Sequence, residues 1–323
     1  LALKKIALFV AGALGFVLLY LLLWPVPVSP VVWDAPAAPG YTGPHAVNTR
    51  LSNLQMIDLQ GEVGPEHIQF GRDGKLYTTV ESGRILRMQP DGTQQEVFAQ
   101  TGGRVLGFDF DAQGHLIAAD AVKGLLSIAP DQSIKLLTDQ VNVGGKPDPI
   151  RYADAVVVAQ NGKMYLSDAS TRFAPKDWGG TFEASVLDIL EQASTGRVLE
   201  FDPANGQTRV VAHGLSFANG VALSQDEKHL FVNETGKYRV WKIDLAAADL
   251  DLHQGPTPQA QVLLDNLPGY PDNLMRGLDG KIWLGFAKPR NATIDNLSAM
   301  PWLRSLTLRL PRVLWPIPKA YGH

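Results

Sequence analysis

The hydrophobic and polar positions follow two different patterns along the chain. Residues 6–24 (IALFVAGALGFVLLYLLLW) carry no charged side chain. At 1.5 Å per residue, a helix of this length spans roughly 28 Å, close to the ~30 Å hydrocarbon core of a bilayer. From Leu54 onward, short apolar stretches alternate with polar turns, which is typical of strands joined by hairpins. The sequence therefore predicts an apolar helix followed by an all-β domain.

The β-rich part repeats itself. Similar turn segments read GRDGKLYTTV at 71–80, DAQGHLIAAD at 111–120, AQNGKMYLSD at 159–168, SQDEKHLFVN at 224–233 and GLDGKIWLGF at 277–286. They recur at intervals of roughly 40–65 residues, which is enough for the four short strands of a propeller blade. Because one such sheet cannot bury both faces, neighbouring sheets must stack around an axis. The longest interval holds an insertion at 173–196, where EASVLDILEQ (183–192) predicts a short helix.

The flanks of the apolar helix predict its role. Lys4 and Lys5 precede it, whereas Tyr20 and Trp24 lie toward its far end. Basic residues favour the cytoplasmic side and aromatic rings favour the membrane interface. We expect a cytoplasmic end (1–5), a single transmembrane anchor (6–24) that binds membrane lipid, a Pro-rich linker (25–50) and a propeller (51–323) on the extracytoplasmic side, periplasmic or extracellular. The alternative is a cleaved signal peptide, whose apolar region usually has ~7–15 residues.

Composition excludes several classes of function. The 323 residues have a formal net charge of −3, so no global basic field would attract a nucleic acid partner. Cysteine is absent, which excludes disulfides, thiolate chemistry and Cys-ligated metal centres.

Polar residues precede or interrupt several apolar strands of the repeat. They are Glu66, Asp154, Asn219, Asp272 and Asn273. Because the inner strands of a propeller converge on its axis, we expect these side chains to meet there. Carboxylate and amide oxygens suit a hard cation such as Ca²⁺, whereas zinc and copper prefer His or Cys ligands. The alternative is that they are turn residues whose side chains bond local backbone.

Several segments of the β-rich part carry a family resemblance. GPEHIQF (64–70), YLSDASTRF (165–173), FANGVALS (217–224) and LPGYPDNLMRGLDGKIWLGFAKPR (267–290) resemble the strictosidine synthase-like proteins, a group that includes adipocyte plasma membrane-associated proteins. The wider superfamily includes gluconolactonases, regucalcin and paraoxonases. The resemblance implies a six-bladed β-propeller, often with a divalent cation in its central channel.

The resemblance also assigns roles to residues. It implies that Glu66, Asn219 and Asp272 bind Ca²⁺, with Asp154 and Asn273 as further ligands, and that Asp272 is the catalytic base. One customary ligand is missing, because Ala153 occupies a position where the family usually has Asn; Asp154 or water would substitute. The channel His of the paraoxonase branch is also missing, since Leu106 precedes Gly107.

Two functions remain open. The first is a membrane-anchored, Ca²⁺-dependent hydrolase of small hydrophobic lactones or esters, in which the cation polarises a carbonyl and a base activates water. The second is a non-catalytic binding or scaffold propeller within a complex of membrane proteins, which the departures at Ala153 and Leu106 favour. Alkaloid condensation is not predicted, because the catalytic Glu of true strictosidine synthases would lie near or beyond His323.

The C-terminal part departs from the repeat. Four complete units and the start of a fifth are visible, so we expect a six-bladed ring to continue for roughly 50 residues beyond His323. Residues 294–317 interrupt the pattern and combine Trp302 with the basic Arg304, Arg309 and Arg312. A basic amphipathic segment of this kind can lie in the membrane interface. The alternative is a helix folded over the propeller.

Overall fold

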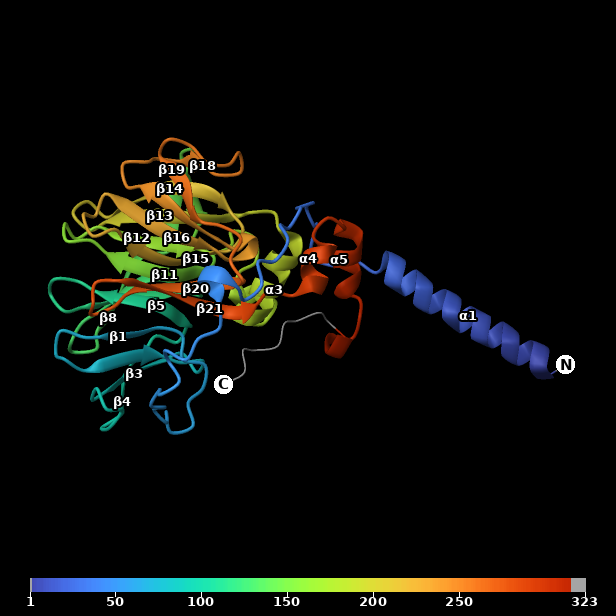
Figure 1. Cartoon of the computed structure of the whole chain (residues 1–323), viewed down its shortest axis with the longest axis horizontal. Helices are drawn as coiled ribbons and strands as arrows, with labels where there is room; N and C mark the ends of the chain where they lie inside the picture. Colours follow the sequence, from blue (N-terminus) through green and yellow to red (C-terminus); the bar gives the residue numbers. More distant parts are fainter. Residues whose placement is uncertain (1, 315–323) are drawn as a thin grey trace.

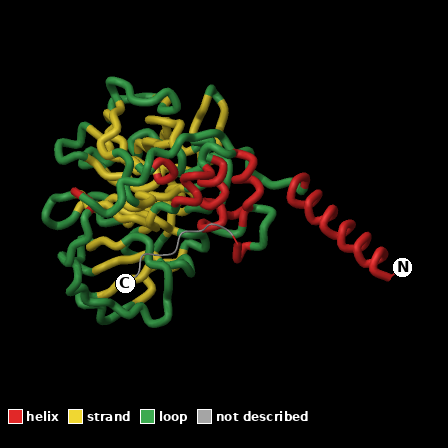
Figure 2. The backbone as a smooth tube through the Cα atoms, turned by 45° about the vertical axis from the view of Figure 1, so that its right-hand side comes forward, coloured by secondary structure: helices red, strands yellow, loops and turns green. Residues whose placement is uncertain are grey.

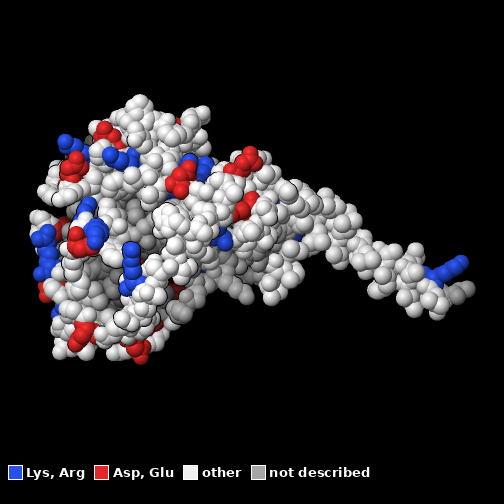
Figure 3. Space-filling model, viewed as in Figure 1, with Lys and Arg blue, Asp and Glu red and all other residues white. Residues whose placement is uncertain are grey.

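A computed structural model describes residues 2–314, which form a strand-rich body and a helical side (Figure 1). Helix α1 (Ala2–Leu23) projects away from the body, and the other helices gather between it and the strands (Figure 2). On the face seen in Figure 3, charged side chains are spread over the body, whereas α1 is uncharged up to its basic tip. The predicted apolar helix is confirmed and is long enough to cross a membrane, although it begins at Ala2 and ends one residue before Trp24.

The first two repeats each form a four-stranded antiparallel sheet with the strands in chain order. The first sheet contains β1 (Ile68–Phe70), β2 (Leu76–Thr79), β3 (Arg84–Met88) and β4 (Glu96–Gln100). The second contains β5 (Val105–Phe110), β6 (Leu116–Asp120), β7 (Gly124–Ile128) and β8 (Ile134–Thr138). Each first hairpin is closed by one of the predicted Gly-containing turns, because glycine readily adopts the positive φ found at Gly74 and Gly114.

The next repeats are larger. A separate hairpin of β9 (Gln140–Val143) and β10 (Lys146–Pro149) precedes the third sheet. The third sheet contains β11 (Ala153–Val158), β12 (Met164–Asp168), β13 (Gly196–Asp202) and β14 (Gln207–Leu215). The fourth contains β15 (Ala218–Leu223), β16 (His229–Glu234), β17 (Arg239–Asp244) and β19 (Ala260–Leu264). Strand β18 (Leu250–Asp251) leaves the fourth repeat and pairs in parallel with β14 of the third sheet.

The fifth repeat contributes β20 (Gly269–Arg276) and β21 (Ile282–Pro289) as a two-stranded sheet. The first strands of successive repeats pack against one another, β5 on β11, β11 on β15 and β15 on β20. The radial stacking predicted from the repeat is therefore present in this part of the chain, and it brings the first strands to a common centre.

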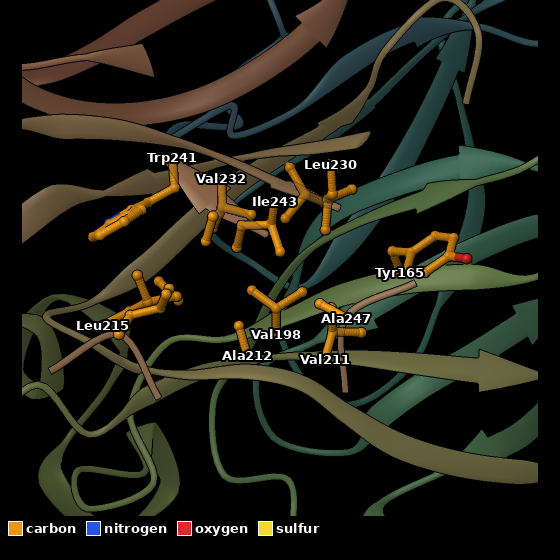
Figure 4. Packing of buried hydrophobic residues seen from close by; sticks show 14 of the residues in the cluster. Tyr165, Val198, Val211, Ala212, Leu215, Leu230, Val232, Trp241, Ile243 and Ala247 are labelled. Atoms are coloured by element: carbon orange, nitrogen blue, oxygen red, sulfur yellow. The ribbon is translucent and has the colours of Figure 1, made fainter. Parts of the chain in front are cut away.

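Apolar side chains fill the space between neighbouring sheets. Figure 4 shows the largest cluster, in which Val198 and Val211 of the third sheet face Val232, Trp241 and Ile243 of the fourth. All five side chains are buried, as the alternation of apolar and polar positions predicts. This packing fixes how each sheet sits against the next, and so fixes the positions of the first strands at the centre.

A buried acid ends the second strand of three sheets. Asp120, Asp168 and Glu234 each accept a backbone N–H from the segment that leads into the first strand of the same sheet, at Arg104, Tyr152 and Ser216. Arg197 Nε also donates to Asp168 Oδ2 at 3.0 Å, and Trp241 Nε1 donates to Glu234 Oε2 at 2.7 Å. These acids hold the start of each first strand and do not face the central cavity.

The helices form a cap on the body. We call α3 (Thr181–Glu191), α4 (Ala292–Leu297) and α5 (Pro301–Thr307) the helical cap; α2 (Pro175–Trp178) precedes it and short 3₁₀ turns lie at Gly43–His45, Thr235–Lys237 and Arg312–Leu314. The helix predicted at 183–192 is confirmed as α3. It ends at Glu191, and the next residue, Gln192, adopts a left-handed conformation with φ of 58°.

The segment after α1 is bound to this cap. We call residues 25–37 the strap. Ser29 N donates to Glu191 Oε2 at 2.8 Å and Val31 N donates to Glu191 O at 2.8 Å, while Val28 is buried against Phe173 and Phe217. The predicted linker is therefore extended but docked, so α1 is joined to the body through a fixed contact.

The interfacial interpretation of residues 294–317 needs correction at Arg304. This side chain is 1% exposed; its Nη1 donates to Leu190 O at 3.0 Å and its Nη2 donates to Val31 O. Its charge therefore faces backbone carbonyls and not lipid, as the alternative of a helix folded over the body predicts. Arg309 donates to Trp24 O at 2.6 Å, and the side chain of Arg312 and residues 315–317 lie outside the described part.

Candidate functional site

A bulge recurs at the same place in four first strands. The register slips after Val105 in β5, after Ala153 in β11, after Ala218 in β15 and after Pro271 in β20. A bulge redirects the side chains of its strand. The residues that follow these positions are Leu106, Asp154, Asn219 and Asp272. Glu66 takes the corresponding place just ahead of β1, where its N–H donates to Thr79 O at 3.1 Å.

The first strands approach closely beside these residues. A Cβ on Gly107 would lie 2.7 Å from Ala155 Cα, and a Cβ on Gly220 would lie 2.3 Å from Leu274 N. Both glycines therefore permit backbone contact between neighbouring first strands. The close approach brings residues from distant parts of the sequence around one centre.

A cavity of about 280 Å³ opens at that centre. Five equivalent residues of the five repeats line it, namely Glu66, Leu106, Asp154, Asn219 and Asp272. Its other lining is mostly apolar and includes Phe217, Tyr270 and one face of α3, with Phe182, Val186 and Ile189 at helical spacing. The cavity thus combines an acidic end with apolar walls under the helical cap.

Asp272 is held from two neighbouring strands. Asn219 Nδ2 donates to Asp272 Oδ1 at 2.8 Å, and Asn233 Nδ2 donates to the main-chain oxygen of Asp272 at 2.7 Å. The other side-chain atom of Asn219, Oδ1, is buried without a hydrogen-bond partner within residues 2–314. An unpartnered carbonyl oxygen beside a carboxylate is suited to a cation, since burial without a partner is costly.

Burial raises the pKa of all three carboxyl groups of the cavity. Burial raises the pKa of Asp272 to about 7, with a further contribution from the negative charge of Glu66. Burial also raises the pKa of Glu66, and it raises the pKa of Asp154 well above the usual range, with Glu66 and Asp272 adding to the effect. Placing a positive charge among them would relieve this repulsion.

The residues present fit a hard cation. They offer three carboxylates and the free amide oxygen of Asn219, which are ligand types that Ca²⁺ prefers. Among the described residues, Glu66, Asp154 and Asp272 do not bring three carboxylate oxygens within 4.8 Å of one another. A bound Ca²⁺ would therefore keep water among its ligands, as its flexible coordination allows.

The cavity lining does not include the predicted ligand Asn273 or Ala153, the position of the missing customary ligand. Asn273 Nδ2 donates to the main-chain oxygen of Glu66 at 2.8 Å, so this amide ties the fifth repeat to the first. Ala153 is buried in an apolar cluster with Ile117 and Leu166, whereas its neighbour Asp154 lines the cavity. Asp154 is thus placed where it could replace the missing ligand of position 153. The ligand roles of all five residues remain predictions.

Sequence reasoning missed two neighbours of the site. Arg104 Nη2 lies 3.8 Å from Glu66 Oε2 and donates to Gly64 O at 3.2 Å, so it offsets part of the acidic charge. The hydroxyl of the buried Tyr152 donates to Thr181 O at 2.8 Å, which ties the cavity wall to the start of α3. Both residues directly precede first strands, and that position was the signal available in the sequence.

The fold and the cavity define the class of protein: a mostly β chain of the propeller type with an acidic central site. Structural similarity agrees. A gluconolactonase from Xanthomonas campestris aligns with a TM-score of 0.55 and 18% identity over 70% of this chain and 71% of that one. A calcium-binding protein, regucalcin, from Agrobacterium tumefaciens aligns with a TM-score of 0.51 and 15% identity over 70% and 68%. At this identity the likeness shows the fold alone.

Sequence comparison gives the family. The family model described as strictosidine synthase-like, N-terminal, matches residues 43–88, and the family model of strictosidine synthase matches residues 154–247. Protein STRICTOSIDINE SYNTHASE-LIKE 6 of Arabidopsis thaliana is 34% identical over 82% of this chain and 67% of its own length. The chain belongs to the strictosidine synthase-like family, which confirms the resemblance.

The family also includes membrane-associated relatives. The human adipocyte plasma membrane-associated protein is 28% identical over 88% of this chain and 68% of its own length.

The chain spans only part of other relatives. It spans 61% and 62% of the length of the Arabidopsis proteins STRICTOSIDINE SYNTHASE-LIKE 4 and 7, to which it is 34% and 36% identical.

Proposed function

We propose that this protein is a membrane-anchored hydrolase of small hydrophobic lactones or esters that depends on Ca²⁺. The observation that carries the proposal is the convergence of Glu66, Asp154, Asn219 and Asp272 on one cavity with apolar walls. The five repeats would belong to a six-bladed propeller, a proposal supported by the stacking of their first strands and by the family match.

Glu66, Asp154, Asn219 and Asp272 would hold the cation through their side-chain oxygens. When bound, Ca²⁺ supplies a positive charge that polarises a substrate carbonyl. Asp272, whose side chain lines the cavity, would accept a proton from water, and a bound cation would keep its carboxyl group ionised and ready to do so. Asn219 would orient Asp272 through its 2.8 Å hydrogen bond.

The cavity walls favour an apolar substrate. Phe182, Val186 and Ile189 of α3 line the cavity, and Lys288 lies over the Phe182 ring at 5.0 Å from its centroid. These side chains would bind an acyl or alkyl group and exclude bulk water from the acidic end. A volume of about 280 Å³ limits the substrate to a small molecule.

The test is an esterase and lactonase assay on the full chain in detergent or nanodiscs. We expect turnover of aryl esters or lactones that is lost with a Ca²⁺ chelator and restored by Ca²⁺. Asp272→Asn should abolish turnover, whereas Asp279→Asn, in the exposed turn between β20 and β21, should not. A panel with no chelator-sensitive turnover would count against the proposal.

The location of the site follows from α1. Lys4 and Lys5 at the start of α1 favour a cytoplasmic N-terminus, which would place the body on the extracytoplasmic side. The docked strap would hold the helical cap toward the bilayer. Alkaline extraction should leave the protein in the membrane, and protease added from the extracytoplasmic side should reach the body. Release into the alkaline supernatant would contradict the anchor.

A second function is favoured by two side chains. Leu106 places an apolar group at one of the five equivalent positions, and Arg104 lies 3.8 Å from Glu66. Both lower the affinity expected for a cation, so a binding or scaffold propeller that assembles with membrane-protein partners is the alternative. Stable co-purification with partners, with no saturable Ca²⁺ binding, would favour it.

A further inference from the structure

A second cluster of metal-binding side chains lies at the outer edge of the third sheet. His213 is on β14, Asp251 is on β18, and His253 follows β18 by two residues. One ligand atom from each side chain lies within 4.8 Å of the others. His253 Nδ1 is 2.9 Å from Asp251 Oδ1, and His213 Nδ1 is 3.9 Å from the same oxygen. The lining of the central cavity includes none of the three.

The backbone holds these side chains together. His213 and Asp251 are direct partners in the parallel pairing of β14 and β18. Leu252 N donates to His213 O at 2.9 Å, and His253 N donates to Asp251 Oδ1 at 2.9 Å. The cluster is therefore built on paired strands and the tight turn that follows them.

Gly214 makes room for His253. It sits at a break in the register between β13 and β14 and has a φ of +88°. A Cβ there would lie 2.5 Å from His253 Nδ1 and 2.8 Å from His253 N. A side chain at position 214 would therefore push His253 away from Asp251 and His213.

The chemistry of the cluster differs from that of the central cavity. Two imidazoles and one carboxylate are ligands typical of Zn²⁺, whereas Ca²⁺ prefers oxygen ligands alone. Ligand atoms around a tetrahedral Zn²⁺ lie about 3.3 Å apart, given bonds of about 2.0–2.2 Å. The two distances to Asp251 Oδ1, 2.9 and 3.9 Å, lie on either side of that value.

The carboxylate of Asp249 lies near the second ring nitrogen of His213. His213 Nε2 lies 3.8 Å from Asp249 Oδ1, on the ring edge opposite the nitrogen that approaches Asp251. Histidines that bind metals commonly donate their other ring N–H to a carboxylate, which fixes the tautomer. Asp249 is 79% exposed, so it is free to move closer.

We propose that His213, Asp251 and His253 form a Zn²⁺ site, with water completing the coordination. The ion would link β18, which comes from the fourth repeat, to β14 of the third sheet. It would act as a structural clamp between two sheets and would be independent of Ca²⁺ at the central cavity.

The experiment measures Zn²⁺ binding to tag-free full chain in detergent after chelation and dialysis. We expect one saturable equivalent that excess Ca²⁺ does not displace. His253→Gln and His213→Gln should each weaken binding at least roughly tenfold. His115→Gln is the matched control, because His115 also lies 2.9 Å from a carboxylate, that of Asp111, and should leave binding unchanged.

A measurement on the unaltered chain guards against misfolded variants. Zn²⁺ should protect His213 and His253, but not His115, from modification by diethyl pyrocarbonate, as mapped by mass spectrometry. Co²⁺ should give the visible spectrum of a site with nitrogen and oxygen ligands. The absence of saturable binding, or Zn²⁺ binding that leaves His213 and His253 fully reactive, would overturn the proposal.

Discussion

Asn219 donates a 2.8 Å hydrogen bond from Nδ2 to Oδ1 of Asp272, although 53 positions separate the two residues in the sequence. They stand at the same place in the bulges of β15 and β20. The bond leaves Asn219 Oδ1 buried and unpartnered in the described part of the chain, beside a carboxylate that burial makes weakly acidic. This pair is the centre of the proposed cation site.

The first prediction distinguishes Asn219, a proposed Ca²⁺ ligand, from Asn273, whose side chain connects the fifth repeat to the first. Asn219→Ala removes the free amide oxygen and the hold on Asp272, so Ca²⁺ affinity should fall at least roughly tenfold. Asn273→Ala removes the bond to Glu66 O and a hydrogen-bond donor beside the Glu66 carboxyl but leaves Asn219 and Asp272 in place, so it should lower the free energy of unfolding by about 1 kcal/mol and reduce affinity less than Asn219→Ala. Calorimetric titration and urea unfolding measure the two effects. Equal losses of affinity would show that both amides bind the ion.

The extent of sequence prediction differs between fold and site. The turns at 71–80 and 111–120 predicted the sheets, because Gly-containing hairpins and strand alternation are local signals. The convergence of Glu66, Asn219 and Asp272 on one cavity follows from their recurrence before apolar strands taken together with the family resemblance. The orientation of Asn273 toward Glu66 could not be predicted, since a bulge of one residue decides which neighbour faces the cavity.

The C-terminal helices show a second limit. Arg304 follows Trp302 in a basic, apolar stretch, and this composition is equally typical of a membrane surface. What decides its burial is the docking of the strap and the carbonyls of Leu190 and Val31, which are contributed by distant segments. A local pattern contains no information on such partners.

The second prediction concerns Arg304. Arg304→Met should lower the free energy of unfolding by about 3 kcal/mol, because it leaves the carbonyls of Leu190 and Val31 without this donor. The strap should also become more sensitive to protease. Lys176→Met, on the exposed surface of α2, is the control and should have little effect. Unfolding by urea measures the difference, and equal stability of the two variants would contradict the role of Arg304 in holding the cap.

The third prediction is a pH dependence from Asp188 in α3. Burial raises the pKa of this carboxyl to about 7 from its ordinary value of 3.8, and the charge of Glu191 adds to the effect while that of Arg172 opposes it. Folding therefore favours the protonated form. The resulting stability is fully present below about pH 4 and is lost as pH rises through 7.

Asp188→Asn keeps a neutral side chain and should remove this dependence. Relative to the variant, the unaltered protein should lose up to about 4 kcal/mol of unfolding free energy between about pH 4 and pH 8. The comparison cancels the titration of Glu66 and the other cavity carboxyls, which both proteins share. Urea unfolding at several pH values tests it, and parallel pH curves for the two proteins would refute it.

The fourth prediction concerns the cavity wall. Val186 lies on the face of α3 that lines the cavity, so Val186→Trp should fill part of its 280 Å³. If the chain hydrolyses esters, KM should rise for long acyl groups and change little for acetyl esters. Leu136→Trp, at a position 48% exposed on β8, is the control. An equal effect on short and long esters would argue against substrate binding under α3.

The most direct test of the account is a crystal structure of the full chain with Ca²⁺. The account predicts a single ion at the acidic end of the cavity, with oxygens of Glu66, Asp272 and Asn219 at roughly 2.3–2.6 Å. Asp154 or water should complete the coordination. Well-ordered side chains of Asn219 and Asp272 around water alone, at a saturating Ca²⁺ concentration, would contradict it.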